Sequence, residues 1–136
     1  MNTAYTFLAF SGLLTILLWT PYILSRMFVW GLPMFLHNYP SGYPAQQPQP
    51  PLWASRAHRV HLNMVETMPA FIAVVVGAGY LSTAQDAELI GQLCQLFFFA
   101  RLAHAVVYIL GIPYLRTPVY LVSWAAVLGI GAQLLP

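Results

Sequence analysis

The feature that most constrains this chain is its first segment, residues 1–25, which contains no charged side chain. A transmembrane helix needs about 20 mostly apolar residues, and further apolar segments follow at roughly 62–81, 89–110 and 118–135. The 136-residue chain is 60% hydrophobic and only 6% charged, whereas soluble domains carry roughly a quarter charged residues. The sequence therefore predicts an integral membrane protein with no length left for a soluble domain.

Other features of the composition exclude an intrachain disulfide and indicate no metal or nucleic-acid partner. No basic residue precedes the first apolar segment and no small-residue cleavage site follows it, so we expect an uncleaved anchor rather than a signal peptide. Cys94 is the only cysteine, which excludes an intrachain disulfide and any cysteine-based metal site, and we expect no metal. The net charge of +2 is too small and too scattered to indicate nucleic acid. Any ligand should therefore meet the protein in or beside the bilayer.

The spacing of the apolar segments predicts a single domain over residues 1–136, built as an all-α, antiparallel bundle of four transmembrane helices. The first connection, about 27–55, is rich in proline, which favours an extended loop over the membrane surface. The other two connections are short, so neighbouring helices should be antiparallel. The expected helices cover about 4–25, 57–81, 88–110 and 118–135.

Basic residues distinguish the two ends of this bundle. Arg26, Arg56 and Arg59 flank the first connection and Arg116 lies in the third, whereas the second, STAQDAE, carries only acidic charges. The positive-inside rule then places the first and third connections in the cytoplasm and both termini outside.

A polar stripe enters the second expected helix from its cytoplasmic end. Arg56, Arg59, Asn63 and Glu66 follow one another at steps of three, four and three, so they share one helix face. At 1.5 Å per residue the stripe extends about 15 Å into the bilayer.

The third expected helix carries a matching stripe of Arg101, His104 and Tyr108. A charge at bilayer depth costs roughly 2.5–3.5 kcal/mol, so such residues turn toward the protein interior and pair with one another. Glu66 and Arg101 lie at comparable depth and are the natural ion pair. That pair either serves only to fix the register of two helices or forms part of a functional site.

Three arginines at the cytoplasmic end, Arg56, Arg59 and Arg116, have no acidic partner in their connections. Each alone could extend to lipid phosphates. Together, beside Asn63 and Tyr108, they favour a site for a polar anionic ligand, because the planar guanidinium group binds carboxylates through two hydrogen bonds.

These segments, RVHLNMVETMP (59–69), ARLAHAVVY (100–108) and LRTPVY (115–120), resemble the MAPEG family of membrane-associated proteins in eicosanoid and glutathione metabolism. The family includes microsomal glutathione transferases and prostaglandin E synthase. The resemblance covers about residues 53–125. It implies a homotrimer of four-helix subunits that binds glutathione, as co-substrate, between neighbouring subunits near the cytoplasmic side.

The resemblance also implies roles for individual residues. Arg116 matches the arginine that stabilises the glutathione thiolate, and Thr117 matches a neighbouring hydroxyl. Arg101 matches the partner of the helix-two glutamate, and His61 matches a histidine that is mostly structural. Met64 departs from the family, because several members have an acidic residue there. The positions that match glutathione contacts are Arg56, Arg59, Asn63, Glu66, His104, Tyr108, Tyr120 and, at the end of the first helix, Arg26.

The function implied is a glutathione-dependent membrane transferase or peroxidase, whose thiolate attacks a lipophilic electrophile or hydroperoxide held by the lipid. A free thiol has a pKa near 8.5, and an adjacent arginine lowers it. One alternative is a non-catalytic MAPEG-like protein that binds lipid. Another is a small translocator with Glu66, His104 and Arg101 as a relay, although the outer halves of the second and third helices, 71–80 and 89–99, are nearly all apolar.

Overall fold

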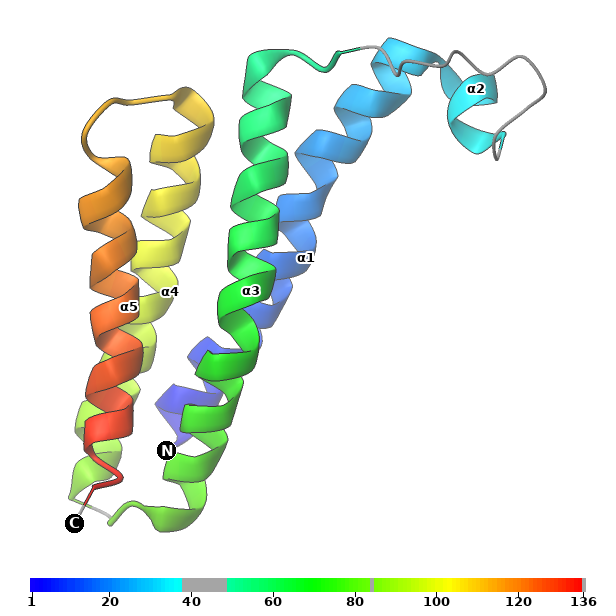
Figure 1. Cartoon of the computed structure of the whole chain (residues 1–136). Helices are drawn as coiled ribbons and strands as arrows, with labels where there is room; N and C mark the ends of the chain where they lie inside the picture. Colours follow the sequence, from blue (N-terminus) through cyan, green and yellow to red (C-terminus); the bar gives the residue numbers. More distant parts are fainter. Residues whose placement is uncertain (38–48, 84, 136) are drawn as a thin grey trace.

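The computed structural model describes residues 1–37, 49–83 and 85–135, and every regular element in these ranges is an α-helix (Figure 1). This confirms the predicted all-helical class. The elements in chain order are α1 (Asn2–Trp30), α2 (Leu32–Leu36), α3 (Leu52–Leu81), α4 (Asp86–Leu110) and α5 (Arg116–Ala132).

Helix α1 continues past the residue where the sequence analysis ended it, at 25, and stops at Trp30. Gly31 ends it, because this residue adopts a φ of 74° that side chains with a Cβ rarely tolerate. The short α2 then follows inside the segment expected to be a loop, with Pro33 in its first turn, where no backbone N–H is needed. Residues 38–48, which hold much of the proline-rich connection, lie outside the described residues.

Three of these helices, α1, α3 and α4, are long and apolar enough to cross a membrane. They support the prediction of an integral membrane protein. Helix α5 has 17 residues, so at 1.5 Å per residue it extends about 25 Å, less than the roughly 30 Å of a hydrocarbon core. The fourth span expected at 118–135 is therefore at the lower limit of length.

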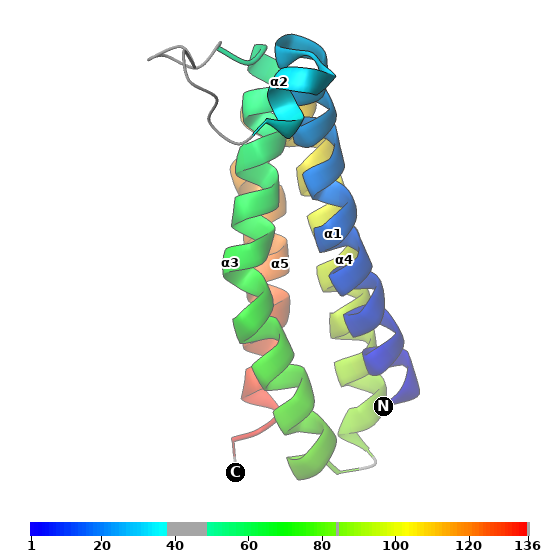
Figure 2. The same ribbon diagram turned by 90° about the vertical axis from the view of Figure 1, so that its right-hand side faces the viewer.

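The long helices lie side by side, with α1 packed against α3 and α4, and α5 packed against α4 (Figure 1). Viewed after a 90° turn, the α1–α3 pair lies in front of the α4–α5 pair (Figure 2). The start of α3 and the α4–α5 connection meet at one end of the molecule, whereas both chain ends and the α3–α4 connection lie at the other. The arginines that lie near helix ends therefore gather at a single end of the molecule; they are Arg26, Arg56, Arg59 and Arg116.

The core forms because α3 and α4 each bury one face. On α3 the buried residues recur every three or four positions, which is the helical period. Phe71 of α3 stacks on Phe97 of α4 with ring centroids 3.8 Å apart. Near the end of α3, a Cβ on Gly79 would meet the Tyr5 hydroxyl of α1. Glycine at this position therefore permits the two helices to approach closely.

Candidate functional site

The site begins with the turn between α4 and α5. Gly111 ends α4 in the left-handed conformation, with φ 73° and ψ 32°, and the Ile112 N–H donates to the Val107 carbonyl at 3.0 Å. This is a typical glycine C-cap. Helix α5 then starts at Arg116 and tolerates Pro118 because the first turn of a helix leaves N–H groups unpaired. The turn therefore places Arg116 and Thr117 beside the last turn of α4.

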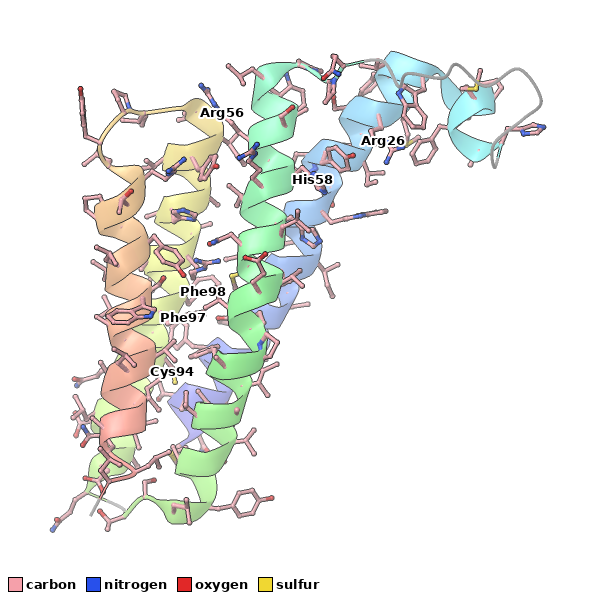
Figure 3. All side chains as sticks on the ribbon, viewed as in Figure 1. Arg26, Arg56, His58, Cys94, Phe97 and Phe98 are labelled. Atoms are coloured by element: carbon pink, nitrogen blue, oxygen red, sulfur yellow. The ribbon has the colours of Figure 1, made fainter. Side chains whose placement is uncertain are left out.

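An outer pocket of about 310 Å³ opens at this turn. Arg56 reaches it from α3, and its guanidinium group lies where a Cβ of Gly111 would be. Figure 3 shows Arg56 between the start of α3 and the end of α4. The outer pocket thus brings together arginines that are far apart in the sequence, and its lining consists of Arg56, Val107, Tyr108, Gly111, Ile112, Pro113, Tyr114, Arg116 and Thr117.

A second, inner pocket of about 300 Å³ lies farther along α3, between this helix and the α4–α5 pair. It shares Tyr108, Arg116 and Thr117 with the outer pocket, so Arg116 lies between the two. None of its lining residues is acidic, and most carry hydrogen-bond donors, which suits an anionic or acceptor-rich ligand. Its lining consists of Arg59, Asn63, His104, Tyr108, Arg116, Thr117 and Tyr120.

Aromatic rings pack against Arg116 and His104 in the inner pocket. The Arg116 guanidinium lies over the Tyr108 ring, 4.9 Å from its centroid, and such cation–π contacts contribute about 0.5–1 kcal/mol at exposed sites. His104 packs edge-on against Tyr108, with centroids 5.6 Å apart, and against Tyr120 at 5.7 Å. His104 is 3% exposed, and its Nδ1 atom has no hydrogen-bond partner in the described part of the chain. A buried ring nitrogen without a partner is the kind of group that a ligand completes.

The structure corrects the predicted ion pair between Glu66 and Arg101. Arg101 is 2% exposed, and its guanidinium donates from Nη1 to Asn63 Oδ1 at 2.9 Å and from Nε to Met64 Sδ at 3.1 Å. Glu66 is exposed on the isolated subunit and forms no ion pair among the described residues. The reason is helical geometry: Asn63 and Met64 bracket the α3 face that meets Arg101, and at about 100° per residue Glu66 points about 110° away from the middle of that face.

Two further predicted residues lie away from both pockets. Arg26 is on α1, where its guanidinium lies over the Trp30 ring at 4.0 Å and Nη1 approaches the Tyr22 hydroxyl at 3.4 Å. Figure 3 shows it on the α1 side of the molecule, far from Arg56. His61 joins α3 to α1 through a contact of 3.1 Å between Nδ1 and the Thr15 carbonyl oxygen. In a single chain, therefore, neither residue reaches the Arg116 pockets.

Sequence reasoning missed five residues of the outer pocket, namely Val107, Gly111, Ile112, Pro113 and Tyr114. The signal was present in the segment GIPY, since a glycine directly after a helix followed by a proline indicates a helix end. Tyr114 gave no such signal, although it adopts a φ of 65° and is 93% exposed.

Comparison with known proteins identifies the family. A sequence model described as the MAPEG family matches residues 3–135, nearly the whole chain. The chain belongs to the MAPEG family. No curated protein and no solved structure matches it.

MAPEG membership and the three apolar helices together identify an integral membrane protein of glutathione-transferase-like or eicosanoid-related type. The family contains enzymes as well as members without enzymatic activity. The two pockets that Arg116 lines are the candidate ligand sites of this MAPEG protein.

Proposed function

We propose that this MAPEG protein is a glutathione-dependent membrane transferase or peroxidase. The observation that carries the proposal is the pair of adjoining pockets, which contain arginines from α3 and α5 and no acidic residue. Glutathione has two carboxylates and two amide carbonyls, so it offers many acceptors to a donor-rich site. Each pocket is near the lower end of the roughly 300–1,000 Å³ usual for small-molecule sites, and glutathione would extend through both.

In this proposal Arg116 stabilises the glutathione thiolate. It lies between the two pockets, and its contact with the Tyr108 ring fixes the position of the charge. Thr117, next in the chain, lines both pockets and offers a hydroxyl donor. The thiolate sulfur attacks the electrophilic atom of a lipophilic substrate and displaces its leaving group. With a hydroperoxide the sulfur attacks the terminal oxygen, the O–O bond breaks, and the departing alkoxide takes a proton from solvent. The sulfur is thereby oxidised to a sulfenic acid, which a second glutathione converts to glutathione disulfide and water.

We also propose that the protein works as a homotrimer. Glu66 lies exposed within an apolar helix, and a carboxylate facing lipid would cost roughly 2.5–3.5 kcal/mol. A neighbouring copy covering this face would remove that cost. It would also allow Arg26, which is distant from the pockets of its own subunit, to approach the site of a neighbour. The ligand would then lie between subunits.

For the membrane arrangement, we propose that α5 is the fourth span and that the arginine-rich end faces the cytoplasm. The start of α3 and the α4–α5 connection lie at that end (Figure 1), and Arg56, Arg59 and Arg116 line the pockets there, in keeping with the positive-inside rule. Both chain ends would then lie on the outer side of the membrane.

One observation favours a second candidate, a MAPEG protein that binds lipid without catalysis. A groove of about 460 Å³ runs beside α1 and is lined almost entirely by apolar atoms, among them those of Leu24, Phe28 and Trp53. Such a groove suits an acyl chain. The translocator alternative gains no such support, because the polar pockets lie at one end of the described structure only.

The test uses the full chain purified in detergent. Titration calorimetry should detect glutathione binding, and conjugation of an aryl halide or reduction of an organic hydroperoxide should follow. Arg116→Ala should lower kcat/KM at neutral pH about tenfold for each unit by which the pKa of the bound thiol rises. Arg116→Lys, which keeps the charge, should retain part of the activity.

The outcomes separate the candidates. A wild-type protein that binds a fatty acid but neither binds nor consumes glutathione contradicts the enzyme proposal and supports lipid binding. Normal glutathione turnover by Arg116→Ala would leave the enzyme proposal standing and refute only the role given to Arg116.

A further inference from the structure

Arg101 is the largest fully buried side chain of the described structure, yet no acidic residue neutralises it. Its contacts are the side-chain oxygen of Asn63, the thioether of Met64 and the ring of Tyr120, whose centroid lies 5.4 Å away. A buried cation is normally paired, and one held only by neutral groups is costly. The arrangement therefore calls for a role beyond helix packing.

The contact with Asn63 has a fixed polarity. A guanidinium group has donors and no acceptor, so the Asn63 atom that faces Arg101 must be the carbonyl oxygen and not the amide nitrogen. Asn63 also lines the inner pocket. With its oxygen directed at Arg101, the amide has its NH2 group, which donates to no protein acceptor among the described residues, available for a ligand in the pocket.

We infer that Arg101 is a positioning residue that sets the hydrogen-bonding polarity of the inner pocket through Asn63. By holding the amide oxygen, it makes Asn63 a donor toward the ligand and excludes the flipped amide, which would offer an acceptor. The pocket at this position then selects a carboxylate or amide carbonyl and rejects an ammonium or hydroxyl donor. This inference rests on the proposed function for the identity of the ligand as glutathione.

The same geometry assigns Met64 a supporting part. Its thioether accepts from Arg101 Nε at 3.1 Å and is fully buried, so it orients the guanidinium without adding a charge. An acidic residue in its place would neutralise Arg101. The thioether instead takes only the Nε donor and leaves Nη1 to hold the Asn63 oxygen.

The experiment is a double-mutant cycle on glutathione binding to the full chain in detergent, with Arg101→Met, Asn63→Leu and the double variant. We expect each single change to raise the Kd about tenfold and the double change to be no worse than the weaker-binding single variant, within a factor of two. Both act on one interaction, so their effects should not add. An additive increase of about a hundredfold would refute the inference, because Arg101 would then act independently of Asn63.

Two further variants separate positioning from structure. Arg101→Lys keeps a cationic donor and should bind glutathione within threefold of wild type, whereas a tenfold loss would refute the inference even if Arg101→Met does not fold. Gln95→Leu removes an exposed amide of α4 outside both pockets and should leave the Kd unchanged. The pH profile of bound thiolate absorbance should not move in Arg101→Met, since Arg116 sets it; a shifted profile would assign Arg101 to the thiolate instead.

The failure of the proposed function would be seen separately. If the wild-type protein binds no glutathione, that result contradicts both the proposed function and the inferred preference of the inner pocket for a carboxylate or amide carbonyl. The Arg101–Asn63 coupling would still be read from melting temperatures of the ligand-free variants, where additive shifts would refute the contact itself.

Discussion

Gly111→Ala tests whether the turn after α4 holds the outer pocket open. The native residue has a φ of 73°, a conformation that costs a residue with a Cβ roughly 1–2 kcal/mol. Alanine also lowers the conformational entropy of the unfolded chain, which stabilises the folded state by about 0.4–1 kcal/mol. The backbone alone therefore predicts a loss of about 1 kcal/mol, or roughly 4 °C in melting temperature for a chain of this size.

The larger effect should be on the ligand. A Cβ at this position would meet the guanidinium group of Arg56, so Arg56 must leave its place in the outer pocket. Loss of one charge-assisted contact to a carboxylate costs about 1.5–3 kcal/mol, so the Kd for glutathione should rise at least tenfold. Titration calorimetry and a thermal melt of the same detergent preparation measure both effects.

Gly131→Ala is the matched control. No atom lies within 4 Å of a Cβ built on Gly131, and its φ is not positive. Alanine in the last turn of a helix should then stabilise the protein by at most about 0.5–1 kcal/mol, with no change in glutathione binding. A Gly111→Ala protein that melts and binds like wild type would refute the reasoning, and one that loses stability but binds normally would show that Arg56 does not contact the ligand.

Two further changes test the placement of individual residues. His61→Ala removes the contact with the Thr15 carbonyl and should lower the free energy of unfolding, measured in a thermal melt, by about 1 kcal/mol. The control, His37→Ala, lies at an exposed position after α2 and should have no measurable effect. Equal effects of the two changes would contradict the α1–α3 contact. Glu66→Gln should change stability by less than about 0.5 kcal/mol, because the carboxylate has no partner among the described residues of its own chain. A loss of the roughly 3–5 kcal/mol typical of a broken buried pair would contradict the corrected pairing of Arg101.

The sequence was informative where helical periodicity decides the outcome. Steps of three and four residues place Arg59 and Asn63 on one face of α3, and the same steps place His104 and Tyr108 together on α4. Both pairs line the inner pocket. The long apolar segments likewise indicated membrane helices, because only length and composition are needed for that inference. The binding and catalytic roles of these residues remain predictions.

Periodicity could not determine which residues touch across helices. Glu66 and Arg101 have complementary charges and similar depth, yet the rotation of α3 brings Asn63 and Met64 to Arg101 instead. Charge complementarity is a property of two residue types, whereas contact depends on the rotation and separation of two helices. The sequence alone does not specify either quantity.

By itself, then, the sequence determined a helical membrane protein of the MAPEG family with its arginines toward one end, because composition, period and motif are local properties of the chain. Only the tertiary structure decided that Arg56 lies against Gly111, that Arg116 lies between two pockets and that the guanidinium of Arg101 is held by an amide and a thioether. These depend on how α3, α4 and α5 pack, and that packing is set by the combined shapes of many buried side chains.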